Sequence, residues 1–204
     1  MEERVFIESV GLKLEGLLGN LPGEKGVVVT HPHPLYGGEM HNNVVDAVVK
    51  AYHAKGYTTF RFNFRGVGGS QGSYDEGRGE QKDVGAALAY LHALGKKAID
   101  LAGYSFGAWV IALGRESFPL ARRLILISPP VSVIDFAFLR DEPRIRLVVT
   151  GTRDDIAGHR TVEEMLPRWN PEAILKVIQG GDHFYGGRTG ELQSILTEFL
   201  DHEK

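Results

Sequence analysis

Serine, aspartate and histidine side chains occur, in this order along the chain, at positions where apolar runs end. Ser105 stands at the centre of Gly103-Tyr104-Ser105-Phe106-Gly107, Asp154 and Asp155 follow the run that ends at Gly151, and His183 lies in a later glycine-rich segment. A serine hydroxyl is a weak nucleophile at neutral pH and needs a base within hydrogen-bond reach, which a carboxylate in turn orients. These residue types in this order therefore indicate acyl-transfer chemistry.

The Gly-x-Ser-x-Gly pattern is weak by itself in a chain with 26 glycines, and its flanks make it specific. A β-type apolar run precedes it at 99–102, and a helix-compatible apolar run follows at 108–113. In such a strand-turn-helix, small residues let the strand and the helix approach closely and push the serine out of a strained turn. The helix N-terminus behind the serine favours developing negative charge.

The rest of the chain alternates segments of strand and helix character from Gly26 onward. This alternation predicts an α/β fold with a mostly parallel, doubly wound sheet flanked by helices. The predicted strands are Val5–Ile7, Leu12–Leu17, Gly26–Thr30, Thr58–Phe64, Ile99–Ala102, Arg123–Ile127, Ile145–Thr150 and Ile174–Ile178. The predicted helices are Asn42–Lys55, Gly77–Leu94, the run after Ser105, Thr161–Trp169 and Gly190–Leu200. In such sheets, sites form beyond the carboxyl ends of the strands, where the three candidate residues stand.

Composition sets the class of protein. The 204 residues are 43% hydrophobic and 24% charged, with a net charge of −3, which suits a single globular domain over 1–204 and gives no basic field for nucleic acid or a membrane surface. The chain has no cysteine, so disulfides and thiolate chemistry are excluded. The charged Met1–Arg4 start and the lack of a long apolar run give the expectation of a cytoplasmic protein without signal peptide or membrane span.

The chain resembles the α/β-hydrolases over nearly its whole length, and more narrowly a small, cap-less group with a His-Pro-His-Pro loop, related to dienelactone hydrolases and prolyl-oligopeptidase catalytic domains. The matching pieces are His31–Gly38, Asn63–Ser70, Gly103–Gly107, Gly151–Asp154 and Asp182–Phe184. The Ser-Asp-His chain order is also that of the family. Dienelactone hydrolases proper use a cysteine nucleophile, which this chain lacks, so their substrate is not carried over.

The resemblance implies roles for particular residues. It selects Asp154 over Asp155 as the acid, because the family's carboxylate stands three residues after the glycine that ends the strand, while Asp155 reads as a turn or capping residue. It makes the Phe106 backbone N–H one half of an oxyanion hole and the loop after the first central strand the other half. Pro32 and Pro34 have no N–H and cannot donate. The resemblance to relatives with His-Gly-Gly-Pro loops implies His33 as the second donor, with Leu35 as the fallback, and the Tyr36 hydroxyl could also reach the site.

Other readings of these loops are weaker. His31 and His33 could both bind zinc, but the prolines and the missing third ligand argue against a metal, and no cofactor is expected. The segment Gly66–Ser70 resembles a phosphate loop, yet it lacks the Gly-Lys-Ser/Thr ending, so a structural turn is favoured. Arg65 beside it is expected to pair with a carboxylate of the following helix.

The interval between the strands that end at Ile127 and begin at Ile145 is too short for a lid domain. It predicts a shallow, open site that suits short acyl groups, which a homodimer could close. The expected apolar wall is Leu35, Tyr36, Phe106, Val131, Phe136, Phe184 and Tyr185.

The predicted function is a serine carboxylesterase for small acyl esters. The alternatives are a thioesterase or small-peptide hydrolase, and a non-catalytic binding module of the same fold.

Overall fold

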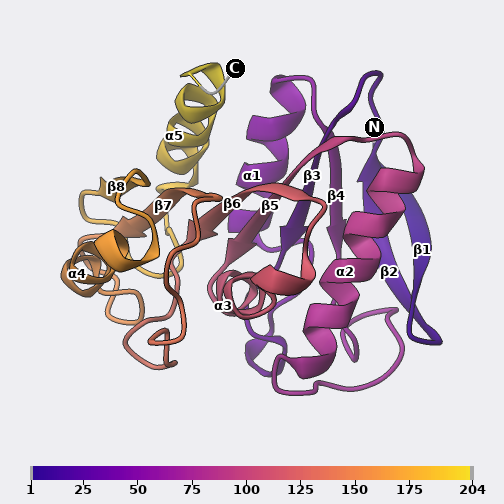
Figure 1. Ribbon diagram of the computed structural model, residues 1–204, viewed down its shortest axis with the longest axis horizontal. Coiled ribbons are helices and arrows are strands. Elements are labelled where there is room, and N and C mark those ends of the chain that lie inside the picture. The colour runs from indigo at the N-terminus through magenta and orange to yellow at the C-terminus, as the bar shows by residue number, and fades with distance from the viewer. Residues whose placement is uncertain (1, 203–204) are drawn as a thin grey trace.

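The computed structural model describes residues 2–202, which form one eight-stranded sheet with helices on both faces (Figure 1). The chain order is β1 (Glu3–Ser9), β2 (Leu12–Gly19), β3 (Lys25–Thr30), η1 (Pro34–Tyr36), α1 (Asn43–Ala54), β4 (Thr58–Phe62), α2 (Arg78–Ala93), β5 (Ala98–Tyr104), α3 (Phe106–Leu113), η2 (Arg115–Ser117), β6 (Ala121–Ile127), β7 (Ile145–Gly151), α4 (His159–Trp169), β8 (Ile174–Ile178) and α5 (Thr189–His202). Every predicted strand and helix is present, with ends displaced by a few residues.

The sheet has the order β1-β2-β4-β3-β5-β6-β7-β8, and its strands run parallel from β4 to β8. The hairpin β1–β2 is antiparallel and joins the sheet through an antiparallel β2–β4 pairing. The central strands are buried along nearly their whole length, because helices cover both faces. This confirms the doubly wound architecture expected from the alternating pattern.

Two apolar layers hold the helices to the sheet. Helices α1 and α5 cover one face with side chains that include Val48 and Leu196, and α2, α3 and α4 cover the other with side chains that include Leu88 and Trp169. Figure 1 shows α2 and α3 in front of the strands. Because α3 starts directly after β5, the central strand, the sheet carries the β5–α3 turn at the middle of its carboxyl edge.

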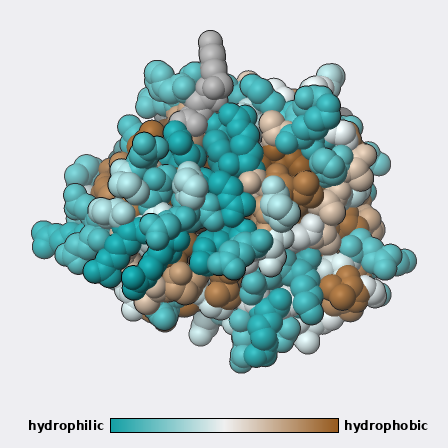
Figure 2. Space-filling model, in the orientation of Figure 1, coloured by the Kyte–Doolittle hydropathy of each residue, from teal (hydrophilic) through white to brown (hydrophobic). Residues whose placement is uncertain are grey.

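The segment between β6 and β7 contains turns and no helix or strand in the described chain. Within residues 2–202, no cap domain therefore covers the carboxyl edge of the sheet. None of the helices within residues 2–202 is long and apolar enough to cross a membrane. On the face seen in Figure 2 hydrophilic side chains predominate, with hydrophobic ones in separate patches.

Candidate active site

The β5–α3 turn holds Ser105 in a backbone conformation that few residues adopt. Its φ is 55° and its ψ is −119°, outside the regions normally open to a residue with a Cβ. The two glycines of the pattern explain how the turn is tolerated. A Cβ on Gly103 would lie 2.6 Å from the Gly107 carbonyl oxygen, and a Cβ on Gly107 would lie 2.5 Å from Thr30 Oγ1. Only glycine at both positions lets β5, α3 and the end of β3 come this close.

The structure brings Ser105, His183 and Asp154 into one line of hydrogen bonds. Ser105 Oγ lies 2.9 Å from His183 Nε2, and His183 Nδ1 lies 2.9 Å and 3.0 Å from the two carboxylate oxygens of Asp154. The three residues follow β5, β8 and β7, whose carboxyl ends meet at the same edge of the sheet. Asp155, the alternative acid, is exposed. The geometry therefore favours Asp154, as the family spacing implies.

The environment of Asp154 keeps its carboxyl group ionised. Burial acts to raise the pKa of Asp154, but the hydrogen bond and the charge of His183, with further donors, outweigh burial and leave the pKa below its usual value. Those donors include the Ala157 N–H, 2.7 Å from Oδ1, and the Ile156 N–H, 3.0 Å from the same atom. An ionised acceptor at Nδ1 fixes the tautomer that leaves Nε2 free to accept the serine proton.

Two backbone N–H groups near Ser105 have no acceptor among the described residues. Phe106 is the first residue of α3, where an N–H has no partner within the helix. The His33 N–H lies in the loop after β3, next to the cavity. Leu35, the fallback donor, is bonded elsewhere, because its N–H donates to His33 Nδ1 at 3.2 Å. Of the three N–H groups predicted as oxyanion donors, those of Phe106 and His33 are thus unpaired within residues 2–202 and that of Leu35 is not.

The two histidine rings of this loop are engaged by protein groups. His31 Nε2 accepts the Phe64 N–H at 3.0 Å, and its Nδ1 donates to the Pro32 carbonyl at 2.7 Å. Burial lowers the pKa of His31 to about 4, so this ring stays neutral. The His33 ring packs on Phe106 at 4.8 Å between centroids, and burial lowers its pKa as well. No group of metal-binding side chains occurs in residues 2–202.

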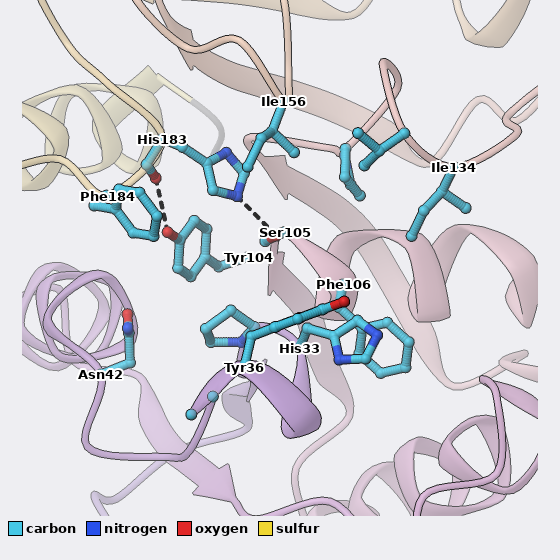
Figure 3. A pocket seen from close by; sticks show the side chains of 15 residues that line it. His33, Tyr36, Asn42, Tyr104, Ser105, Phe106, Ile134, Ile156, His183 and Phe184 are labelled. Atoms are coloured by element: carbon cyan, nitrogen blue, oxygen red, sulfur yellow. Dashed lines mark hydrogen bonds between the residues drawn. The ribbon is translucent and has the colours of Figure 1, made fainter.

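A cavity of roughly 500 Å³ opens above Ser105 (Figure 3). The structure places Tyr36 and Phe184 on its wall, as expected, and both are exposed at its mouth. The lining residues are Pro32, His33, Tyr36, Gly37, Gly38, Asn42, Tyr104, Ser105, Phe106, Pro130, Val133, Ile134, Ile156, His183 and Phe184.

Comparison with known proteins identifies the family. The model of the Alpha/beta hydrolase family matches residues 27–175. The chain belongs to this family. The alpha/beta hydrolase is 38% identical over 189 residues to an uncharacterized protein of Rickettsia prowazekii (strain Madrid E), covering 88% of this chain and 79% of the relative.

Two solved structures share the whole fold. An alpha-beta serine hydrolase homologue from Coxiella burnetii is 35% identical, with a TM-score of 0.88 over 96% of both chains. An α/β serine hydrolase without lid from Xanthomonas campestris is 29% identical, with a TM-score of 0.90 over 98% of this chain and 94% of that one. The Xanthomonas campestris protein lacks a lid, and no cap domain occurs in residues 2–202 of this chain either.

Part of the expected pocket wall of the alpha/beta hydrolase is wrong. Leu35 is exposed and does not line the cavity. The ring of Phe136 lies 5.5 Å from that of Trp169, between centroids, in the apolar layer under α2, α3 and α4. Val131 packs against the same layer. Tyr185 is buried, with its hydroxyl 2.8 Å from Ser128 Oγ. The segment after β6 turns without forming a helix, so Val133 and Ile134 face the cavity instead.

Three further lining residues, Asn42, Tyr104 and Ile156, are not among those that the sequence predicts for the site. Asn42 is the first residue of a predicted helix, and no local pattern marks Ile156. Tyr104 directly precedes the serine, and its hydroxyl donates to the His183 carbonyl at 2.7 Å. A polar aromatic side chain beside a strained serine is a signal that could have drawn attention to Tyr104.

Proposed function

We propose that this alpha/beta hydrolase is a serine carboxylesterase that cleaves short-chain acyl esters through a Ser105-His183-Asp154 triad. The observation that carries the proposal is the continuous hydrogen-bonded line from Asp154 through His183 to Ser105, with the serine in a strained turn at the base of an open cavity. This arrangement activates a hydroxyl that is otherwise a poor nucleophile.

In the proposed reaction, Ser105 Oγ attacks the ester carbonyl carbon while His183 Nε2 takes the hydroxyl proton. The N–H groups of Phe106 and His33 hold the negative charge that develops on the carbonyl oxygen. The protonated His183 then donates its proton to the leaving alkoxide, which departs as an alcohol and leaves an acyl-enzyme. Water attacks the acyl carbon, gives its proton to His183, and releases the carboxylic acid as the proton returns to Ser105 Oγ.

The preference for short acyl groups follows from the shape of the site. The turns of residues 128–144 form one rim, and no lid domain in the described part of the chain covers the cavity. The residues at its mouth, Tyr36, Val133 and Phe184, are at least 67% exposed. A long acyl chain would leave much of its apolar surface in water and so gain little binding energy beyond the first few carbons.

Hydrolysis of p-nitrophenyl esters from acetate to laurate, by the wild type and by Ser105→Ala, tests this function. Activity should be highest for the short esters and absent in Ser105→Ala. A fluorophosphonate probe should label the wild type and Ser132→Ala, a control that removes an exposed serine near the cavity, and should not label Ser105→Ala.

Other outcomes distinguish the alternatives. Labelling of Ser105 without hydrolysis of any ester would move the assignment to thioesters or small peptides. A folded protein that is neither labelled nor active would contradict a catalytic role and favour a binding module of this fold.

A further inference from the structure

The cavity has chemically different sides, separated by Ser105. One side is aliphatic and is made by Pro130, Val133, Ile134 and Ile156, from the segments that follow β6 and β7. The other contains Asn42, Tyr104 and Phe184. In Figure 3, Ile134 and Asn42 lie on opposite sides of Ser105. An ester bound with its carbonyl carbon at Ser105 must therefore place one substituent on each side.

The second side combines the aromatic rings of Tyr104 and Phe184 with the polar side chain of Asn42. Asn43 Nδ2 donates to the Phe184 carbonyl at 3.0 Å, which ties the start of α1 to the loop that carries His183. Phe184 and His183 meet edge to face at 5.6 Å between ring centroids, and the Tyr104 ring lies 5.6 Å from His183. Aromatic walls of this kind favour an aromatic ligand group in edge-to-face or offset contact.

The Asn42 side chain presents its amide group as a donor on this side. Its carbonyl oxygen accepts the Val44 N–H at 2.9 Å and caps α1, which fixes the rotamer. No described residue accepts a hydrogen bond from its Nδ2. The Tyr104 hydroxyl cannot serve instead, because it donates to the His183 carbonyl. Asn42 Nδ2 is thus a pre-positioned donor for a group of the substrate.

We propose that the ester cleaved here carries a short aliphatic acyl group on one side of the ester bond and, on the alcohol side, an aromatic ring with an oxygen acceptor that Asn42 binds. This inference rests on the proposed ester hydrolysis and assigns Asn42 as a residue that determines specificity. A substrate ring without the acceptor would leave the Asn42 donor without a partner once bound, which is the basis of discrimination between such substrates.

Matched esters test the acceptor. Para-methoxyphenyl and para-methylphenyl acetates have leaving groups of nearly equal acidity and differ in the acceptor oxygen; the meta isomers extend the pair. Methyl methoxybenzoates and methyl methylbenzoates reverse the orientation, so the two series show whether the ring belongs to the alcohol or to the acid. We expect kcat/KM for the methoxy ester to exceed that for its methyl partner by about fivefold in the phenyl acetate series.

Two substitutions separate recognition from helix capping. Asn42→Asp retains an oxygen that caps α1 and has no donor when ionised, and Asn42→Ser retains a capping oxygen on a side chain too short to place a donor where the amide stood. Each should bring the methoxy-to-methyl ratio close to one, with a melting temperature near that of the wild type. Val133→Ala, on the aliphatic side, should keep the ratio and change the preference among acetate, butyrate and hexanoate esters.

The outcomes are distinct. Hydrolysis with a ratio near one in the phenyl acetate series, or a ratio that survives in both Asn42 variants, would overturn this inference alone. If no ester were hydrolysed and Ser105 were not labelled by a fluorophosphonate, the proposed function would fail and this inference with it.

Discussion

At the scale of single residues, the site depends on backbone positions as much as on side chains. Ser105 has a φ of 55° in a turn so tight that there is no room for a Cβ at Gly103 or Gly107. Its hydroxyl lies within hydrogen-bond reach of His183. His33 contributes differently, through a backbone N–H next to a proline on either side. The roles of the Asp154 carboxylate and of the His33 backbone N–H can each be tested with a matched pair of variants.

The acid can be tested against its exposed neighbour. Asp154→Asn should lower kcat for ester hydrolysis by on the order of 10⁴, because a neutral amide no longer stabilises the protonated His183 or its tautomer. Asp155→Asn removes one negative charge from the adjacent, exposed position and should leave kcat within about twofold of the wild type. Equal losses in the two variants, measured with the same short ester, would contradict the role of Asp154.

A substitution can remove the backbone N–H of His33 and keep the φ angle of this residue. His33 has a φ of −59°, which proline also adopts, so His33→Pro deletes the N–H without forcing this angle. His33→Ala is the matched control, since it loses the ring and keeps the N–H. We expect kcat of the proline variant to be lower than that of the alanine variant by on the order of 10². Similar kcat values would place the second oxyanion donor elsewhere.

At the scale of elements, buried ion pairs and tight turns set where the loops lie. Arg65 donates from Nε and Nη2 to the two oxygens of Asp83 at 3.0 Å and 2.7 Å, so the loop after β4 is fixed to α2, as the sequence led us to expect. In the same loop the Gly69 N–H donates to Glu15 Oε2 at 2.6 Å. Because a carboxylate of the protein binds in this turn, we interpret Gly66–Ser70 as a structural turn and not as a phosphate-binding loop.

The β1–β2 hairpin carries removable strain. Val10 and Gly11 have φ values of 50° and 79°, as in the tight turns that prefer Asn-Gly. A β-branched residue is unfavourable at positive φ, so Val10→Asn should stabilise the fold by about 1 kcal/mol and raise the melting temperature by about 2–4 °C. Val10→Thr, which keeps the branch, should give no gain. A lower melting temperature for Val10→Asn would contradict this account of the turn.

At the scale of the whole molecule, one sheet with an apolar layer on each face supports the Ser105, Asp154 and His183 side chains, which come from three separate loops. Tyr52 and Val28 are among the fully buried side chains of these layers. Because the loops rise from neighbouring parallel strands, packing of the layers fixes the distances between the site residues. Conditions that weaken the layers or the loop attachments should therefore affect stability and activity together.

His31 makes the stability of the molecule depend on pH. Burial lowers its pKa from 6.5 to about 4, so between these values the unfolded chain binds a proton that the folded chain does not. The contribution of His31 to the free energy of unfolding is therefore fully present above pH 6.5 and should fall by up to about 3 kcal/mol as the pH drops to 4. Urea unfolding at pH 7 and pH 4.5 should show that His31→Gln loses less of its free energy of unfolding between these pH values than the wild type does. The exposed His92→Gln control should behave as the wild type.

The sequence by itself determined the order of strands and helices, the strained serine turn, and the three residue types at strand ends. These features are local, because periodicity, Gly-x-Ser-x-Gly spacing and apolar runs act over a few residues. Only the tertiary structure decided which aspartate meets His183, which amides remain unpaired, and that Asn42, Ile134 and Ile156 face Ser105 while Phe136 enters the core. Those outcomes depend on how irregular loops pack against distant segments, and no local pattern encodes that packing.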